Sequence, residues 1–345
     1  MKAMVLEGVK QLKLRQLPDP KPGANEVVIK VAYCGVCMTD VHMYTGSFPV
    51  KTPIVLGHEC SGIVSEVGSE VSKVSVGDHV ALNPLINCGQ CWYCISGRTN
   101  LCENSLVIGG AGEVIINGAY AEYVKVPERN VVKYDEGISL KHAALTEPLA
   151  CAVHGIELAK VRPGDRVVII GAGPIGLMLT QLSVINGSSQ VIVLDLKDER
   201  LKVAKQVGAS EVVNPRERDP VEAIKEATGG EFADIVIEAV GSTTTVQDTF
   251  KYVRKGGRIV IFGVSPRKAL ASFSPFDVYF RELEIIGSYA VSAESFIRSA
   301  ALISRAKIDL NALITDIYRL EDLEEAIMKT ERGEGLKKLI SVAGG

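Results

Sequence analysis

Four cysteines stand close together in the chain, at Cys88, Cys91, Cys94 and Cys102. Thiolates at this spacing on one loop can surround a single zinc ion tetrahedrally. Four sulfur ligands close the coordination sphere and leave no position for water or substrate. We therefore expect a structural zinc ion in a lobe at 85–105. An iron–sulfur cluster and plain buried thiols are the alternatives for this cysteine cluster.

A second set of metal-binding residue types is spread over the first 150 residues. It consists of Cys37, the pair His58-Glu59 after Gly57, and Glu147 before Pro148. Three protein ligands beside an open position are typical of catalytic zinc. Taken singly, each residue also fits a structural role. A redox dithiol at Cys34-x-x-Cys37 is disfavoured, because no thioredoxin-like βαβ pattern surrounds it.

A glycine motif follows the apolar strand expected at 166–170. Its sequence is Gly171-Ala172-Gly173-Pro174-Ile175-Gly176, and it opens a predicted helix. Such a turn lets the backbone approach a pyrophosphate, which the helix N-terminus then binds. Asp195 lies 24 residues after Gly171 and suits the ribose hydroxyls of NAD, while its charge would repel the 2′-phosphate of NADP. Glycines used only for packing, and Asp195 as a helix cap, are the alternatives.

Three further positions are candidates for contact with the cofactor. Arg200 follows Asp195 by five residues and could cover the adenine or be a surface arginine. Val240 and Val264 each stand just beyond an expected strand, at the edge where parallel sheets bind nucleotides.

The order and spacing of these motifs resemble the zinc-containing medium-chain dehydrogenase/reductase family over essentially the whole chain. The sorbitol (polyol) and threonine dehydrogenase branch is the most similar. The resemblance rests on Gly57-His58-Glu59, on Glu147-Pro148-Leu149 and on the four-cysteine lobe. It implies a catalytic zinc ion held by Cys37, His58 and one or both of the glutamates, and it leaves open which glutamate is the direct ligand. Alcohol dehydrogenases proper usually carry a cysteine at the place of Glu147.

The resemblance also implies roles for residues around the metal. Thr39 and His42 match a proton relay, and Asp40 matches a residue that orients the ligand histidine. Lys337 matches a basic position that can approach the cofactor phosphates, whereas Met38 stands where several relatives carry a basic residue. Residues expected around the substrate cleft are Tyr44, Phe48, Leu106 and Tyr120.

The distribution of strands and helices predicts an α/β chain with two domains. Short β-type runs at 27–31, 61–67 and 78–82 suggest an irregular, barrel-like β domain, which the resemblance identifies as GroES-like. After about residue 150, apolar strands alternate with helical stretches, as in a doubly wound parallel sheet of the Rossmann type. We expect the catalytic domain at 1–152, the nucleotide-binding domain at 153–287, and a return to the catalytic domain at 288–345.

Composition limits the class of function. The chain has 345 residues with 47% hydrophobic and 23% charged residues, and a net charge of −3 gives no general attraction to nucleic acid or anionic membrane. A signal peptide and a membrane span are not recognisable, so we expect a cytoplasmic protein. The family resemblance implies a homotetramer or homodimer joined near 258–264 and 283–289.

Together these features predict a zinc-dependent oxidoreductase that transfers hydride between a secondary alcohol, such as a polyol or sugar, and NAD. L-Threonine and vicinal diols are alternative substrates for the same site. A nucleotide-binding relic without turnover is an alternative from another class, and a zinc-independent enone or quinone reductase is a third. Both are disfavoured, because the metal ligands and the proton relay are all present.

Overall fold

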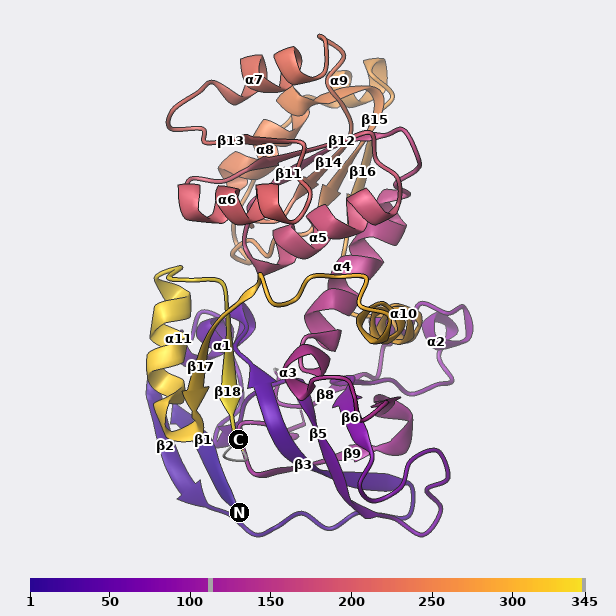
Figure 1. Cartoon of the computed structure of the whole chain (residues 1–345), viewed down its shortest axis with the longest axis vertical. Helices are drawn as coiled ribbons and strands as arrows, with labels where there is room; N and C mark the ends of the chain where they lie inside the picture. The colour runs from indigo at the N-terminus through magenta and orange to yellow at the C-terminus, as the bar shows by residue number, and fades with distance from the viewer. Residues whose placement is uncertain (111–113, 343–345) are drawn as a thin grey trace. The chain divides into compact units, whose positions relative to one another are not determined.

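The computed structural model describes residues 1–110 and 114–342. The chain divides by its internal contacts into two compact units (Figure 1). Residues 1–150 and 291–345 form the first unit, and residues 151–290 form the second.

Antiparallel sheets dominate the first unit. A three-stranded sheet has the order β2-β1-β4, and a larger one has the order β10-β6-β5-β3-β18-β17, with β9 also paired to β3. The bounds of these strands are β1 Lys2–Gly8, β2 Gln11–Gln16, β3 Glu26–Gly35, β4 Ile54–Val55, β5 Glu59–Val67, β6 His79–Leu82, β9 Tyr123–Pro127, β10 Val131–Tyr134, β17 Ile314–Arg319 and β18 Lys337–Ser341. A separate two-stranded sheet joins β7 (Leu85–Ile86) to β8 (Leu106–Val107).

The end of the chain completes the large sheet of the first unit. Strand β18 pairs antiparallel with β3, so that Ile340 lies opposite Cys34, and Figure 1 shows this yellow strand next to the indigo β3. As a result, residues near 337 lie beside residues near 36, although they are 300 positions apart in the sequence. This pairing is what brings C-terminal side chains to the candidate site.

The first unit also contains helices and 3₁₀ turns. They are α1 (Met38–Thr45), α2 (Trp92–Ile95), α3 (Leu140–Ala143), α10 (Ala293–Ser304) and α11 (Leu323–Glu331), with 3₁₀ turns η1 (Thr99–Leu101), η2 (Glu128–Asn130) and η3 (Leu320–Asp322). Helix α4 (Thr146–Ala159) begins in the first unit and ends in the second.

A parallel sheet of six strands forms the second unit, in the order β13-β12-β11-β14-β15-β16. Its elements are β11 (Arg166–Ile170), α5 (Pro174–Ile185), β12 (Gln190–Leu194), α6 (Asp198–Gln206), β13 (Glu211–Val213), α7 (Pro220–Ala227), β14 (Ala233–Glu238), α8 (Thr243–Tyr252), β15 (Val253–Ile261), α9 (Pro275–Phe280) and β16 (Glu284–Gly287). Order and direction are those of the doubly wound Rossmann fold, so the predicted fold class is confirmed.

The central strands of this sheet are continuously apolar, without alternating polar residues, because both of their faces are buried. Val167 to Ile170 are buried on both faces, as are Val191 to Leu194. A parallel sheet covered by helices on both sides requires such continuous apolar runs. In the part of the chain that the structure describes, no helix is both long enough and apolar enough to cross a membrane.

Candidate active site

Cys37 is fixed at the start of helix α1. It is the N-cap residue, and its Sγ accepts a hydrogen bond from the Thr39 backbone N–H at 3.4 Å. The Asp40 carboxylate in turn accepts the Cys37 backbone N–H at 3.0 Å. This reciprocal capping pattern satisfies the first N–H groups of the helix. It also holds the thiol, which is half-buried, in one orientation.

His58 and Glu59 stand where strand β5 begins, and both are buried. Ligand atoms of Cys37, His58 and Glu59 all lie within 4.8 Å of one another. Gly35 permits this arrangement, because a Cβ atom there would stand 2.0 Å from Glu59 Oε2. Cys37 at the start of α1 and the adjacent His58 and Glu59 at the start of β5 are therefore brought together.

The carboxylate of Asp40 lies next to the imidazole ring of His58. Its Oδ1 lies 3.5 Å from His58 Nδ1, which leaves Nε2 of the imidazole for a metal. Burial alone would lower the pKa of His58, but Asp40 and Cys37 outweigh it and raise the pKa well above its usual value. Without a metal, a proton therefore competes for this ligand.

Lys337 forms a buried ion pair with Glu59 that sequence reasoning missed. Its Nζ lies 2.7 Å and 2.6 Å from the two carboxylate oxygens of Glu59 and 3.1 Å from the Val36 carbonyl oxygen. Lys337 is only 5% exposed and Glu59 1%. Burial would lower the pKa of Lys337, but Glu59, Cys37 and Glu147 raise it overall. The ammonium group thus stays charged, and Glu147 acts on the same cluster.

The expected proton relay occupies one face of α1. Thr39 Oγ1 lies 3.5 Å from Cys37 Sγ, and His42 Nδ1 lies 3.2 Å from Ser47 Oγ. Residues three apart on a helix are neighbours on its surface, so Thr39 and His42 adjoin. Both side chains are half-buried.

The four-cysteine lobe is assembled as predicted. The Sγ atoms of Cys88, Cys91, Cys94 and Cys102 lie within 4.8 Å of one another. Backbone N–H groups point at two of these sulfurs, from Cys88 to Cys102 at 3.2 Å and from Cys91 to Cys88 at 3.4 Å. Backbone hydrogen bonds from Gln90 and Cys91 lower the pKa of Cys88 to about 6, whereas burial raises the pKa of Cys94 to about 12. The donor set fits a closed Zn²⁺ site.

The glycine motif has the form that a nucleotide site needs. Gly171 adopts a φ of +103°, and a Cβ at Gly176 would lie 1.8 Å from the Gly171 carbonyl oxygen. A Cβ at Gly173 would meet no described atom within 4 Å, so the turn is open at the N-terminus of α5, where Pro174 and Ile175 follow. Asp195 Oδ2 accepts the Ala172 N–H at 2.7 Å, and Oδ1 accepts the Lys197 N–H at 2.9 Å. A carboxylate has acceptor capacity left for ribose hydroxyls.

Val240 and Val264 are exposed at the ends of β14 and β15. A Cβ on Gly171 would lie 2.9 Å from Val240 Cγ2, so Val240 adjoins the glycine motif. Buried Glu238 holds this loop, accepting the N–H groups of Val240 at 2.9 Å and Gly241 at 2.8 Å. Arg200 lies on α6, and its role stays a prediction.

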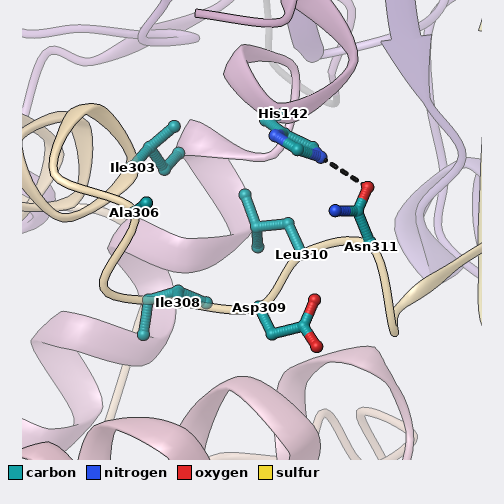
Figure 2. A pocket seen from close by; sticks show the side chains of 7 residues that line it. All are labelled: His142, Ile303, Ala306, Ile308, Asp309, Leu310 and Asn311. Atoms are coloured by element: carbon teal, nitrogen blue, oxygen red, sulfur yellow. Dashed lines mark hydrogen bonds between the residues drawn. The ribbon is translucent and has the colours of Figure 1, made fainter.

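A cavity of about 270 Å³ lies apart from these residues, between α3 and the loop after α10 (Figure 2). His142 lines it and lies 2.9 Å from Asn311 Oδ1 through its Nε2. This contact agrees with a structural role for His142. None of the predicted site residues lines this cavity.

Two aromatic residues that we expected at the substrate cleft are buried. The Tyr44 hydroxyl donates to Glu324 at 2.5 Å, and Tyr120 is fully buried behind the metal ligands. Burial and Glu324 raise the pKa of Tyr44 to about 12. Phe48 and Leu106 are exposed. A substrate surface is therefore not formed by these two tyrosines.

Comparison with known proteins decides the family. Residues 23–136 match the model of the alcohol dehydrogenase GroES-like domain, and residues 174–305 match that of zinc-binding dehydrogenases. The chain belongs to the zinc-containing medium-chain dehydrogenase/reductase family. It is 34% identical to sorbitol dehydrogenase of Bacillus subtilis over 95% of this chain and 92% of that protein. It is 36% identical to D-xylulose reductase A of Aspergillus oryzae over 98% and 96%.

A solved structure gives the same result for the fold. A zinc-binding dehydrogenase of Sinorhizobium meliloti, bound to NADP, superposes with a TM-score of 0.94 at 35% identity, over 99% of this chain and 98% of that one. The β-rich first unit is therefore GroES-like, and this member of the family is an oxidoreductase. The donor set of Cys37, His58 and a carboxylate fits a catalytic zinc ion.

Proposed function

We propose that this enzyme is an NAD-dependent zinc dehydrogenase of polyols, sugars or similar secondary alcohols. The observation that carries the proposal is the convergence of Cys37, His58 and Glu59 within 4.8 Å, with no second thiolate in the group. Named relatives that act on sorbitol and xylulose support the substrate class. L-Threonine and vicinal diols remain candidates for the same site.

The roles of the residues follow from their positions. Cys37 and His58, with Glu59 or Glu147, would hold the zinc ion, and the structural zinc ion would be held by the cysteine lobe. Zinc would supply a Lewis acid to the substrate hydroxyl, and the nicotinamide would accept hydride. The Thr39 hydroxyl takes the proton of the substrate and passes it along α1 to His42, which reaches solvent. Asp40 keeps His58 in the tautomer that binds metal.

The cofactor preference is argued from Asp195. Its carboxylate is anchored by two backbone N–H groups at the end of β12 and next to the glycine motif. A fixed negative charge there attracts ribose hydroxyls and repels a 2′-phosphate. We therefore propose NAD, although a related dehydrogenase was solved with NADP. Comparing kcat/KM for NAD and NADP tests this, and a preference for NADP would refute it.

The cellular compartment and the assembly of the enzyme are also proposed. The eight cysteines, all within the described residues, form no disulfide bond, which suits a reducing, cytoplasmic compartment. Assembly into a homotetramer or homodimer is proposed through the open edge of the second unit's sheet, at β16.

Substitution of Cys37 by serine tests the catalytic assignment. Losing this thiolate removes a zinc ligand, so we expect at least a roughly 100-fold fall in kcat with a sugar alcohol and NAD. The fold and the lobe zinc should be unchanged, and metal analysis should fall from two zinc ions per chain to one. A Cys151→Ser variant is the control. Normal turnover by Cys37→Ser would refute the proposal, whereas one zinc per wild-type chain would favour the relic.

A further inference from the structure

The hydroxyl of Tyr120 contacts Asp40, the residue that faces His58, and it has no role in the proposed function. Tyr120 is 0% exposed, and its hydroxyl oxygen lies 2.8 Å from Asp40 Oδ2 and 2.9 Å from the Gly35 carbonyl oxygen. One proton serves two acceptors. Because a charged acceptor binds a donor more strongly than a neutral carbonyl, the proton is directed at Asp40.

This contact fixes the orientation of the Asp40 carboxylate. Oδ2 is occupied by the Tyr120 hydroxyl and the Cys37 backbone N–H, at 2.8 Å and 3.0 Å. Oδ1 is therefore the oxygen that faces His58 Nδ1, at 3.5 Å. Asp40 is completely buried, so a water molecule cannot readily replace a lost donor.

Tyr120 also supports the turn that carries His58. Its backbone N–H donates to the Leu56 carbonyl oxygen at 3.0 Å, and the N–H of Ala119 donates to that of Gly57 at 2.9 Å. A Cβ on Gly57 would stand 3.0 Å from Cγ of the Tyr120 ring, so ring and turn are in close contact. One side chain thus connects the cap of α1, which holds Cys37, with the turn before His58.

We propose that Tyr120 is a positioning residue of the catalytic zinc site, acting through Asp40 on His58 and on the capped N-terminus that carries Cys37. The inference rests on the proposed function, because it concerns the same metal. Groups that orient a ligand histidine contribute about 10- to 100-fold to metal affinity when they touch it directly. Tyr120 acts one residue further out, so we expect roughly a tenfold effect or less.

The test is zinc release from the purified enzyme. Tyr120→Phe removes the hydroxyl but keeps the ring against Gly57. Each variant is mixed with an excess of a coloured chelator, and the Cys37→Ser variant identifies which release phase belongs to the catalytic site. We expect Tyr120→Phe to release that zinc about threefold to tenfold faster, with the phase of the cysteine lobe unchanged. Tyr44→Phe, which also loses a buried hydroxyl bound to a carboxylate, should release both ions at wild-type rates.

Four outcomes separate the possibilities. Faster release from the catalytic site alone, with altered visible bands after replacement of that zinc by cobalt, supports the inference. Equal rates in Tyr120→Phe and wild type overturn it, as does equal acceleration of both phases, which would mark a general loss of stability. Absence of any catalytic-site zinc in the wild type would instead overturn the proposed function.

Discussion

At the scale of single residues, the Glu59–Lys337 pair sets the charge of the metal cluster. Both side chains are buried, and the ammonium group contacts both oxygens of the carboxylate. While this ion pair is intact, the negative charge of Glu59 is compensated by Lys337 and not by the metal. Glu147 acts on the same lysine and raises its pKa, but the ligand atoms that lie within 4.8 Å of one another are those of Cys37, His58 and Glu59. The pair therefore bears directly on which glutamate binds.

Replacing Lys337 by methionine tests how much the Glu59–Lys337 ion pair contributes to the stability of the fold. The variant leaves Glu59 buried without its cation, and such a loss costs about 3–5 kcal/mol. We expect the metal-free variant to unfold at clearly lower urea concentration than metal-free wild type, monitored by circular dichroism. Added zinc should stabilise the variant more than the wild type, because a divalent cation compensates the unpaired carboxylate.

The double variant Lys337→Met/Glu59→Gln is the matched control for this prediction. It removes both charges, so much of the lost stability should return. If the single and double variants unfold alike, the ion pair does not have the importance that its burial indicates.

At the residue scale, spacing alone predicts contacts only between residues that are close in the sequence, and the grouping of Cys37 with His58 and Glu59 was expected from the family resemblance. Cysteines at Cys88 and Cys91 are three residues apart, and the pairing of Cys37 with Asp40 follows from helix capping. Glu59 and Lys337 are 278 residues apart and meet only because β18 pairs with β3. Tyr120 and Asp40 are 80 residues apart and meet through packing. No spacing rule predicts such contacts.

At the scale of elements, the apolar strands of the second unit were the most predictable part. The strand at 166–170 was expected with the bounds that the structure has. Strand β15 begins at Val253 and includes the run Arg254 to Gly257, which carries no apolar pattern of a buried strand. Strand β13 has three residues and helix α7 has eight, which is too short for a clear periodic pattern in the sequence.

Asp234 shows how one side chain holds three strands of this sheet together. Its carboxylate accepts the Arg166 backbone N–H at 2.8 Å from β11 and Arg254 Nε at 2.6 Å from β15, and it lies on β14 itself. Burial alone would raise the pKa of Asp234, but the Arg166 N–H and Arg254 outweigh it and lower the pKa. Asp234 therefore stabilises the fold in its charged form.

We expect Asp234→Asn to destabilise the protein by about 1–3 kcal/mol at pH 7, as for hydrogen bonds to a charged group. Since the folded pKa is lowered, this contribution is complete above the unfolded value of about 3.9 and is lost as pH falls through the folded value. Urea unfolding at pH 7 and near pH 3.5 measures the difference between variant and wild type, which should shrink at the lower pH.

The exposed pair of Asp248 and Lys251 provides the control for Asp234. Asp248→Asn removes an ion pair of 2.7 Å on the surface of α8, where such pairs contribute little. Its effect should stay below about 1 kcal/mol at both pH values. A pH-independent loss in Asp234→Asn would contradict the role of the carboxylate charge.

At the scale of the whole molecule, the sheet of the second unit ends in an open edge. Strand β16 is the last strand and pairs only with β15. Ile285 on this strand is 40% exposed. Further exposed apolar side chains lie on the segments before and after β16. Those most exposed are Leu270, Phe273, Phe276, Tyr279, Phe280 and Tyr289. An unprotected edge beside so much exposed aromatic surface is typical of an interface.

The homodimer or homotetramer proposed above would place a second copy of the chain at this edge. Two copies of β16 can pair about a twofold axis, so that one surface covers its own equivalent and the aromatic residues of both copies are buried. We expect Ile285→Lys to weaken this association, because the change places two like charges close together across the axis. Sedimentation should show a smaller species than for wild type, and the dissociation constant should rise at least roughly tenfold, since 1.4 kcal/mol suffices for that change.

The control for this prediction is Ile297→Lys, on the exposed face of α10 in the first unit. It adds the same charge at an exposed isoleucine that is not part of the second unit's sheet. Its sedimentation should match that of wild type. If both variants remain associated as the wild type does, β16 is not the contact between copies. The exposed aromatic residues of α9 would then have to be covered in some other way, because isolated surfaces of this kind promote aggregation.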